Sequence, residues 1–154
     1  YWINVLNQSK AAGGTALTIM AAAGVVGNLI GGRLSDQFGH RRMIVASFGI
    51  LTFFLPALLW VTNIAIATIL LIPIGMALSS CYSPIVVLGQ RYLPNHIGLA
   101  SGFTLGVTIS IGGMTAPLLG KIADIYGIWT ALATILFVPI LSAGIGATLK
   151  TPKI

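Results

Sequence analysis

Five long apolar stretches restrict the fold of this chain more than any other feature. They are residues 11–32, 43–61, 64–90, 97–119 and 128–149. A helix needs about 20 apolar residues to cross the hydrocarbon core of a bilayer, and each stretch is long enough. Charged residues make up only 6% of the chain, against about 25% in soluble domains. The sequence therefore predicts an all-α membrane protein with five transmembrane helices.

The start of the chain suggests that it is part of a longer protein. The first residue is Tyr1 rather than Met, and residues 1–5 are apolar enough to be the end of a preceding transmembrane helix. We therefore expect five complete transmembrane helices plus the end of a sixth.

Basic residues are unevenly distributed between the two sides of the expected helices. One side holds Arg33, Arg41, Arg42, Arg91, Lys150 and Lys153, and the other holds Lys10 and Lys121. Because Lys and Arg concentrate in cytoplasmic loops, we expect the C-terminus to lie in the cytoplasm. The net charge of +6 does not indicate nucleic-acid binding, since the basic residues stand singly or in pairs without interleaved aromatic residues.

An eight-residue pattern occurs twice in the chain. GRLSDQFG at residues 32–39 matches GKIADIYG at residues 120–127 as glycine, basic, aliphatic, small, Asp, any residue, aromatic and glycine. An odd number of expected helices separates the copies, so they should lie on opposite faces of the membrane. This arrangement is typical of the inverted repeats of secondary transporters. The alternative is that both copies are ordinary turns between helices.

The first copy and a later segment resemble a known family. GGRLSDQFGHRR resembles the loop motif of the major facilitator superfamily, and GQRYLPNHIGLASGFTLGVTISIGG resembles the fosmidomycin-resistance-type drug exporters of that family. Gln37 and His40 stand where the family has Arg or Lys. The resemblance implies that residues 1–154 form the C-terminal half of a twelve-helix transporter, from the end of helix seven through helix twelve, with inverted three-helix repeats. The partner would be the missing N-terminal six-helix half.

The resemblance also assigns a gating role to the first copy. In the family, this motif contacts a helix of the other half and holds one conformation of the gate. The residues concerned here are Gly32, Asp36, Gly39, Arg41 and Arg42. The alternative is a structural turn whose arginines reach into water. For the second copy, with Gly120, Asp124 and Gly127, we expect a structural role.

Polar side chains within the apolar stretches are candidates for lining a substrate cavity. Ser79, Tyr82 and Ser83 share a helical face of the third stretch, which the resemblance places at the cavity. Thr104 and Thr108 lie on a hydroxyl stripe of the fourth stretch. The alternative is that these hydroxyls bond to their own helix backbone or to a neighbouring helix.

Small residues in two stretches suggest close helix packing. In the fourth stretch the glycines at positions 98, 102, 106 and 113 form a stripe, and in the first stretch Asn28 accompanies Gly27 and Gly31. We expect the glycines to form a packing face and Asn28 to hydrogen-bond between helices.

The sequence contains no residue set typical of catalysis. It has no Ser-His-Asp combination, metal-ligand cluster or phosphate-binding loop, and we expect its single cysteine, Cys81, to be inert and buried. We therefore expect no enzyme activity, cofactor or metal.

The expected function is secondary transport across the bacterial inner membrane. The transporter would export a small, fosmidomycin-like drug molecule by alternating access. No Asp, Glu, Lys, Arg or His lies deep in any stretch. We expect the full-length transporter to be proton-coupled, with the titrating group in the missing half or in the missing helix. The alternative is a membrane structural or receptor-like protein on the same scaffold that does not transport.

Overall fold

The computed structural model describes Trp2, Leu6 and residues 8–148, and within these residues the chain is helical without strands. The elements are α1 (Lys10–Phe38), α2 (His40–Trp60), α3 (Ile64–Ser80), α4 (Tyr82–Tyr92), a 3-10 turn (Pro94–His96), α5 (Ile97–Tyr126) and α6 (Ile128–Thr148). Five membrane-crossing segments result, because α3 and α4 together form the third. The predicted all-α architecture with five spans is confirmed. The expected end of a sixth helix at residues 1–5 lies outside the described residues, apart from Trp2.

The first and fourth transmembrane helices extend beyond their apolar stretches. α1 continues to Phe38 and α5 to Tyr126, so Gly32, Asp36, Gly120 and Asp124 lie in helical turns rather than in loops. The loop assignment was wrong because hydropathy reports where a helix lies in lipid. A helix continues its own backbone hydrogen bonds into water until a residue takes non-helical torsions.

The third transmembrane segment is interrupted at Cys81, between α3 and α4. Pro84 explains the break, because proline lacks an N–H and its ring clashes with the carbonyl four residues earlier, at Ser80. In the first turn of α4 the same proline is tolerated, and the helix resumes with Ile85 N–H donating to the Cys81 carbonyl at 3.2 Å. The remaining helix-internal prolines, Pro56, Pro73, Pro117 and Pro139, leave their helices unbroken.

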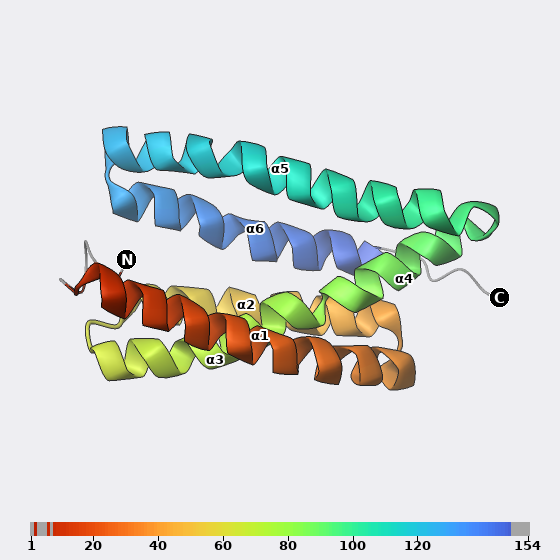
Figure 1. The fold of residues 1–154 in the computed structure, drawn as a ribbon, viewed down its shortest axis with the longest axis horizontal. Coiled ribbons are helices and arrows are strands. Elements are labelled where there is room, and N and C mark those ends of the chain that lie inside the picture. The colour runs from red at the N-terminus through yellow and green to blue at the C-terminus, as the bar shows by residue number, and fades with distance from the viewer. Residues whose placement is uncertain (1, 3–5, 7, 149–154) are drawn as a thin grey trace.

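The helices form two groups that meet along α2 and α4 (Figure 1). α1 packs mainly on α3, and α2 packs on α3 and on α6. α5 contacts only α4, α6 and the 3-10 turn among the described elements. The α1–α2 turn and the end of α6 lie at one end of the bundle, and the α5–α6 turn lies at the other (Figure 1). The two copies of the repeated pattern therefore lie at opposite ends, as the sequence predicts.

Glycines allow the backbones of α1 and α3 to come into direct contact. A Cβ on Gly31 would lie 2.5 Å from the Cβ of Ser80, and one on Gly27 would overlap the backbone of Met76. On the opposing helix, a Cβ on Gly75 would overlap the carbonyl oxygen of Met20. Lipid provides little hydrophobic force between helices, so close van der Waals packing of this kind holds membrane helices together.

The outer face of α5 has no such partner. Ala100 is buried, but the glycines at positions 98, 102, 106 and 113 have no atom of the described chain within 4 Å of a built Cβ. Their predicted packing face is therefore uncovered within the part of the chain that the structure describes. Asn28 is exposed on α1, so its predicted contact between helices is not formed within the described residues.

We predict that Gly27→Ala destabilises the protein by about 1–3 kcal/mol, because the added methyl group would force α1 away from the Met76 backbone. The measurement is thermal unfolding of the full-length protein in detergent. Gly14→Ala is the matched control, since a Cβ there meets nothing within 4 Å in the described structure and lies on the same helix. Equal melting temperatures for the two variants would contradict the proposed contact.

Candidate functional site

Gly39 alone connects α1 to α2 at one end of the bundle. Its φ is 92° and its ψ is 141°, a combination that side-chain-bearing residues rarely adopt. Its N–H donates to the Ser35 carbonyl at 3.0 Å, and its carbonyl accepts from the Met43 N–H at 3.2 Å. Space is not limiting, because a Cβ on Gly39 would meet nothing within 4 Å in the described structure. The turn requires glycine for its torsions.

A buried polar pair lies directly beneath this turn. Ser35 and His40 are 2% and 5% exposed, and the Ser35 hydroxyl hydrogen-bonds to Nδ1 of His40. The bond closes the turn from the inside, across Gly39. This pair was not predicted from the sequence, although Ser35 and His40 differ from their counterparts in the second copy, Ala123 and Ile128.

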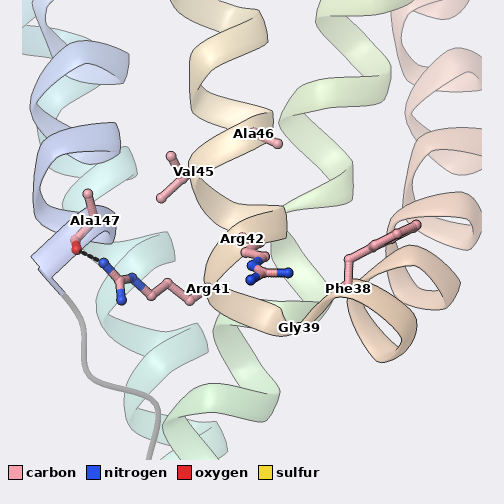
Figure 2. Close-up of a pocket in the computed structure, with 7 residues that line it drawn as sticks. All are labelled: Phe38, Gly39, Arg41, Arg42, Val45, Ala46 and Ala147. Carbon is pink, nitrogen blue, oxygen red and sulfur yellow. Dashed lines mark hydrogen bonds between the residues drawn. The ribbon is translucent and has the colours of Figure 1, made fainter.

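Arg41 joins the start of α2 to the end of α6. Its guanidinium donates to the Ala147 carbonyl in the last turn of α6 (Figure 2). The last carbonyls of a helix lack intrahelical donors and carry partial negative charge, so an arginine there is favourable. Behind this contact, Gly146 lets α6 approach Ile44 and Val45 of α2. Arg41 thus links α2 to α6, the two helices that follow the copies of the repeated pattern.

A pocket of about 690 Å³ opens beside the turn. Its lining residues are Phe38, Gly39, Arg41, Arg42, Val45, Ala46 and Ala147 (Figure 2). Asp36 is not part of this lining. It is exposed in the last turn of α1, between the buried Ser35 and the rim of the bundle. The structure therefore gathers Gly39, Arg41 and Arg42 around one pocket and leaves the Asp36 carboxylate at the surface.

The second copy repeats the turn but not its surroundings. Gly127 has a φ of 86° and a ψ of 158°, close to the values of Gly39. The helices that follow the two glycines, α2 and α6, are both 21 residues long. Gly120 and Asp124 are exposed, and a Cβ added at Gly120 or at Gly127 would meet no other part of the described chain within 4 Å. The shared torsions support the predicted internal repeat.

The candidate cavity residues of the third segment lie mostly against α1. A Cβ on Gly24 would lie 2.5 Å from the Ser79 hydroxyl oxygen, and a Cβ on Gly32 would lie 3.9 Å from that of Ser83. Tyr82, in contrast, is 44% exposed. Within this chain, Tyr82 is the side chain of the three that faces open space.

Thr104 and Thr108 donate to carbonyls of their own helix. Thr104 bonds to the Ala100 carbonyl at 2.8 Å and Thr108 to the Thr104 carbonyl at 2.6 Å. Thr104 also lines a mainly apolar pocket of about 400 Å³ between α2, α4, α5 and α6, whereas Thr108 is exposed. The five candidate cavity residues therefore do not converge on one cavity within the described chain.

Two further polar contacts between helices were not predicted from the sequence. The hydroxyls of Ser47 and Ser80 lie 2.8 Å apart and are buried between α2 and α3. The Gln90 side-chain amide donates to the Ser101 hydroxyl at 2.8 Å and joins α4 to α5. Cys81, predicted to be buried, is buried with its thiol directed at the Leu78 carbonyl. Among the described residues, no group of three or more His, Cys, Asp or Glu side chains could hold a metal ion.

Five apolar spans joined by short turns, with the repeated glycine turns at opposite ends, define a multi-pass α-helical membrane protein. The family model of the Major Facilitator Superfamily matches residues 1–153. The chain belongs to this family of membrane transporters.

Similar proteins are found in bacteria and mammals. An uncharacterised MFS-type transporter of Bacillus subtilis is 34% identical over 77% of this chain and 29% of its own length. The fosmidomycin resistance protein of Escherichia coli is 34% identical over 75% of this chain and 28% of its own length. The organic cation/carnitine transporter 2 of the rat is 34% identical over 61% of the chain and 17% of its own length. The chain thus matches less than a third of the length of these relatives. No solved structure matches it significantly.

We predict that Gly39→Ala destabilises the protein by about 1–3 kcal/mol, because alanine is strained at the torsions of Gly39. The melting temperature of the full-length protein in detergent measures the effect. Gly49→Ala is the control, since a Cβ added at Gly49, inside α2, would meet nothing within 4 Å in the described structure and alanine favours a helix. If Gly39→Ala melts at or above the temperature of Gly49→Ala, the turn does not depend on glycine.

Proposed function

We propose that residues 1–154 form the C-terminal half of a drug exporter that works by alternating access. Family membership supports transport, and the 34% identity to the fosmidomycin resistance protein of Escherichia coli supports a small, fosmidomycin-like substrate. The missing partner is an N-terminal six-helix half of the same protein. The uncovered glycines of α5 offer a small-residue surface on which that half could pack.

The observation that carries the proposal is the geometry around Gly39. The Ser35–His40 bond and the Gly39 torsions hold the end of α1 against the start of α2. Asp36 is then presented outward at the end of the bundle. A carboxylate held in this way can accept hydrogen bonds from the N-terminus of a helix in the other half. We infer that this contact between Asp36 and the other half stabilises one gate conformation. When the contact breaks, the bond from Arg41 to α6 would make α2 and α6 move together.

Substrate and ion coupling depend on groups outside this chain. The substrate cavity would lie between the two halves, with Tyr82 an exposed candidate on this side. No charged side chain lies deep in a described span, so we propose that the proton-coupling residue belongs to the N-terminal half.

We further propose that the protein lies in the bacterial inner membrane with the Gly39 end in the cytoplasm. Arg33, Arg41, Arg42 and Arg91 flank the turns at this end, while Lys10 and Lys121 flank the other. The bias matches the excess of basic residues in cytoplasmic loops. Lys150 and Lys153, which belong to the same argument, lie outside the described residues.

Fosmidomycin tolerance tests the exporter and the role of Asp36 together. The full-length gene should raise the minimum inhibitory concentration in a drug-sensitive bacterium. Asp36→Asn should reduce that tolerance. A charge-assisted hydrogen bond contributes about 1.5–3 kcal/mol, so its loss would shift the gate equilibrium by about tenfold or more. Asp124→Asn, at the corresponding position of the second copy, is the matched control and should keep wild-type tolerance.

Membrane abundance of each variant is measured by immunoblot. If wild type and Asp36→Asn confer equal tolerance at equal abundance, Asp36 has no gating role. If the wild type confers no tolerance, the substrate assignment fails, and the alternative of a non-transporting membrane protein gains support. The chain of 154 residues expressed alone should confer no tolerance, because it lacks the other half of the cavity.

A further inference from the structure

The pocket beside Gly39 combines two kinds of wall. Arg41 and Arg42, in the first turn of α2, form its charged side at the end of the bundle. Val45 and Ala46, one turn further into the membrane-crossing helix, form an apolar side together with Phe38, which is 60% exposed. Figure 2 shows the arginines near the turn and the two aliphatic side chains higher along α2. Polar groups therefore lie at the end of the bundle and apolar groups toward its middle.

The two arginines differ in what they bind. Arg41 is engaged with the Ala147 carbonyl, whereas Arg42 makes no hydrogen bond to any residue that the structure describes. Figure 2 shows Arg42 directed away from Arg41, toward the side of Phe38. A guanidinium group carries five donors in a planar fork that suits phosphate oxygens, so Arg42 has the donors for an anionic ligand.

The surrounding charge also favours an anion. Arg33, Arg41, Arg42 and Arg91 lie near this end of the bundle and Asp36 is the acid among them, while the other acid of the chain, Asp124, lies near the opposite end. The local excess of positive charge attracts anions and weakens binding of cations.

We propose that this pocket binds the headgroup of an anionic phospholipid. The phosphodiester would lie against Arg42, with Arg41 contributing charge, and the first part of an acyl chain would lie along Phe38, Val45 and Ala46. A volume of about 690 Å³ is sufficient for a phosphoglycerol headgroup with the start of its chains. The arginines lie at the end of the bundle and the apolar side chains lie further along α2. This arrangement favours a lipid over free phosphate, because an acyl chain can contact the apolar side chains and free phosphate cannot.

The test uses the full-length protein purified in detergent and phosphatidylglycerol as the probe. Native mass spectrometry measures the fraction of protein that retains one lipid over a lipid titration. We expect Arg42→Gln to weaken phosphatidylglycerol binding by about tenfold, because a charge-assisted hydrogen bond is lost. Arg91→Gln removes an exposed charge at the same end of the bundle, outside the pocket, and should leave binding within about twofold of wild type.

Two further measurements test the charge at position 42 and distinguish lipid binding from binding of free phosphate. Arg42→Lys keeps the charge but not the planar fork, so we expect it to bind more lipid than Arg42→Gln and less than wild type. Binding no better than that of Arg42→Gln would contradict a role for the charge at this position. Inorganic phosphate at millimolar concentration should not displace the lipid. Equal loss in Arg42→Gln and Arg91→Gln, no loss in Arg42→Gln, or full displacement by inorganic phosphate would each overturn the proposal.

Discussion

Direct backbone contact between α1 and α3 is the constraint on which the rest of the bundle depends. Gly27 and Gly75 permit it, because a methyl group at either position would overlap the opposing backbone. In water such glycines would mainly cost chain entropy, but in lipid close packing is a principal source of helix association. The contact also brings Gly24 and Gly32 against Ser79 and Ser83, and it sets where α2 can lie. Through α2 and Arg41, it determines the position of α6.

The two repeated glycine turns share one backbone geometry but differ in the side chains around them. Gly39 and Gly127 share nearly the same torsions, yet the first turn is stabilised from inside by Ser35 and His40. The second has Ala123 and Ile128 at these positions, which can pack but cannot hydrogen-bond. The first turn is thus more firmly built, and it is the one that presents Asp36 and the arginine pocket.

The sequence predicted the spans well because the bilayer makes apolar length a direct signal of a crossing helix. Helix ends were less predictable, since α1 and α5 continue past their apolar residues until Gly39 and Gly127 take positive φ. The Ser47–Ser80 contact depends on which helices become neighbours, and a single sequence carries no such information. The Ser35–His40 contact is local, but it depends on the torsions that Gly39 takes between the two helices. Ser79 and Ser83 share the predicted face, but the packing of α1 decides what that face meets. For α5, the glycine stripe was visible in the sequence, but no described residue packs on it.

The central claim is that the two copies of the pattern lie on opposite faces of the membrane, and site-directed thiol labelling tests it most directly. Gln37→Cys and Ile125→Cys, introduced singly into the full-length protein with Cys81→Ala, place one thiol in each exposed turn region. A membrane-impermeant maleimide applied to intact cells should label Ile125→Cys and should label Gln37→Cys only after the cells are permeabilised. Labelling of both positions in intact cells, or of both only after permeabilisation, would contradict the inverted repeat.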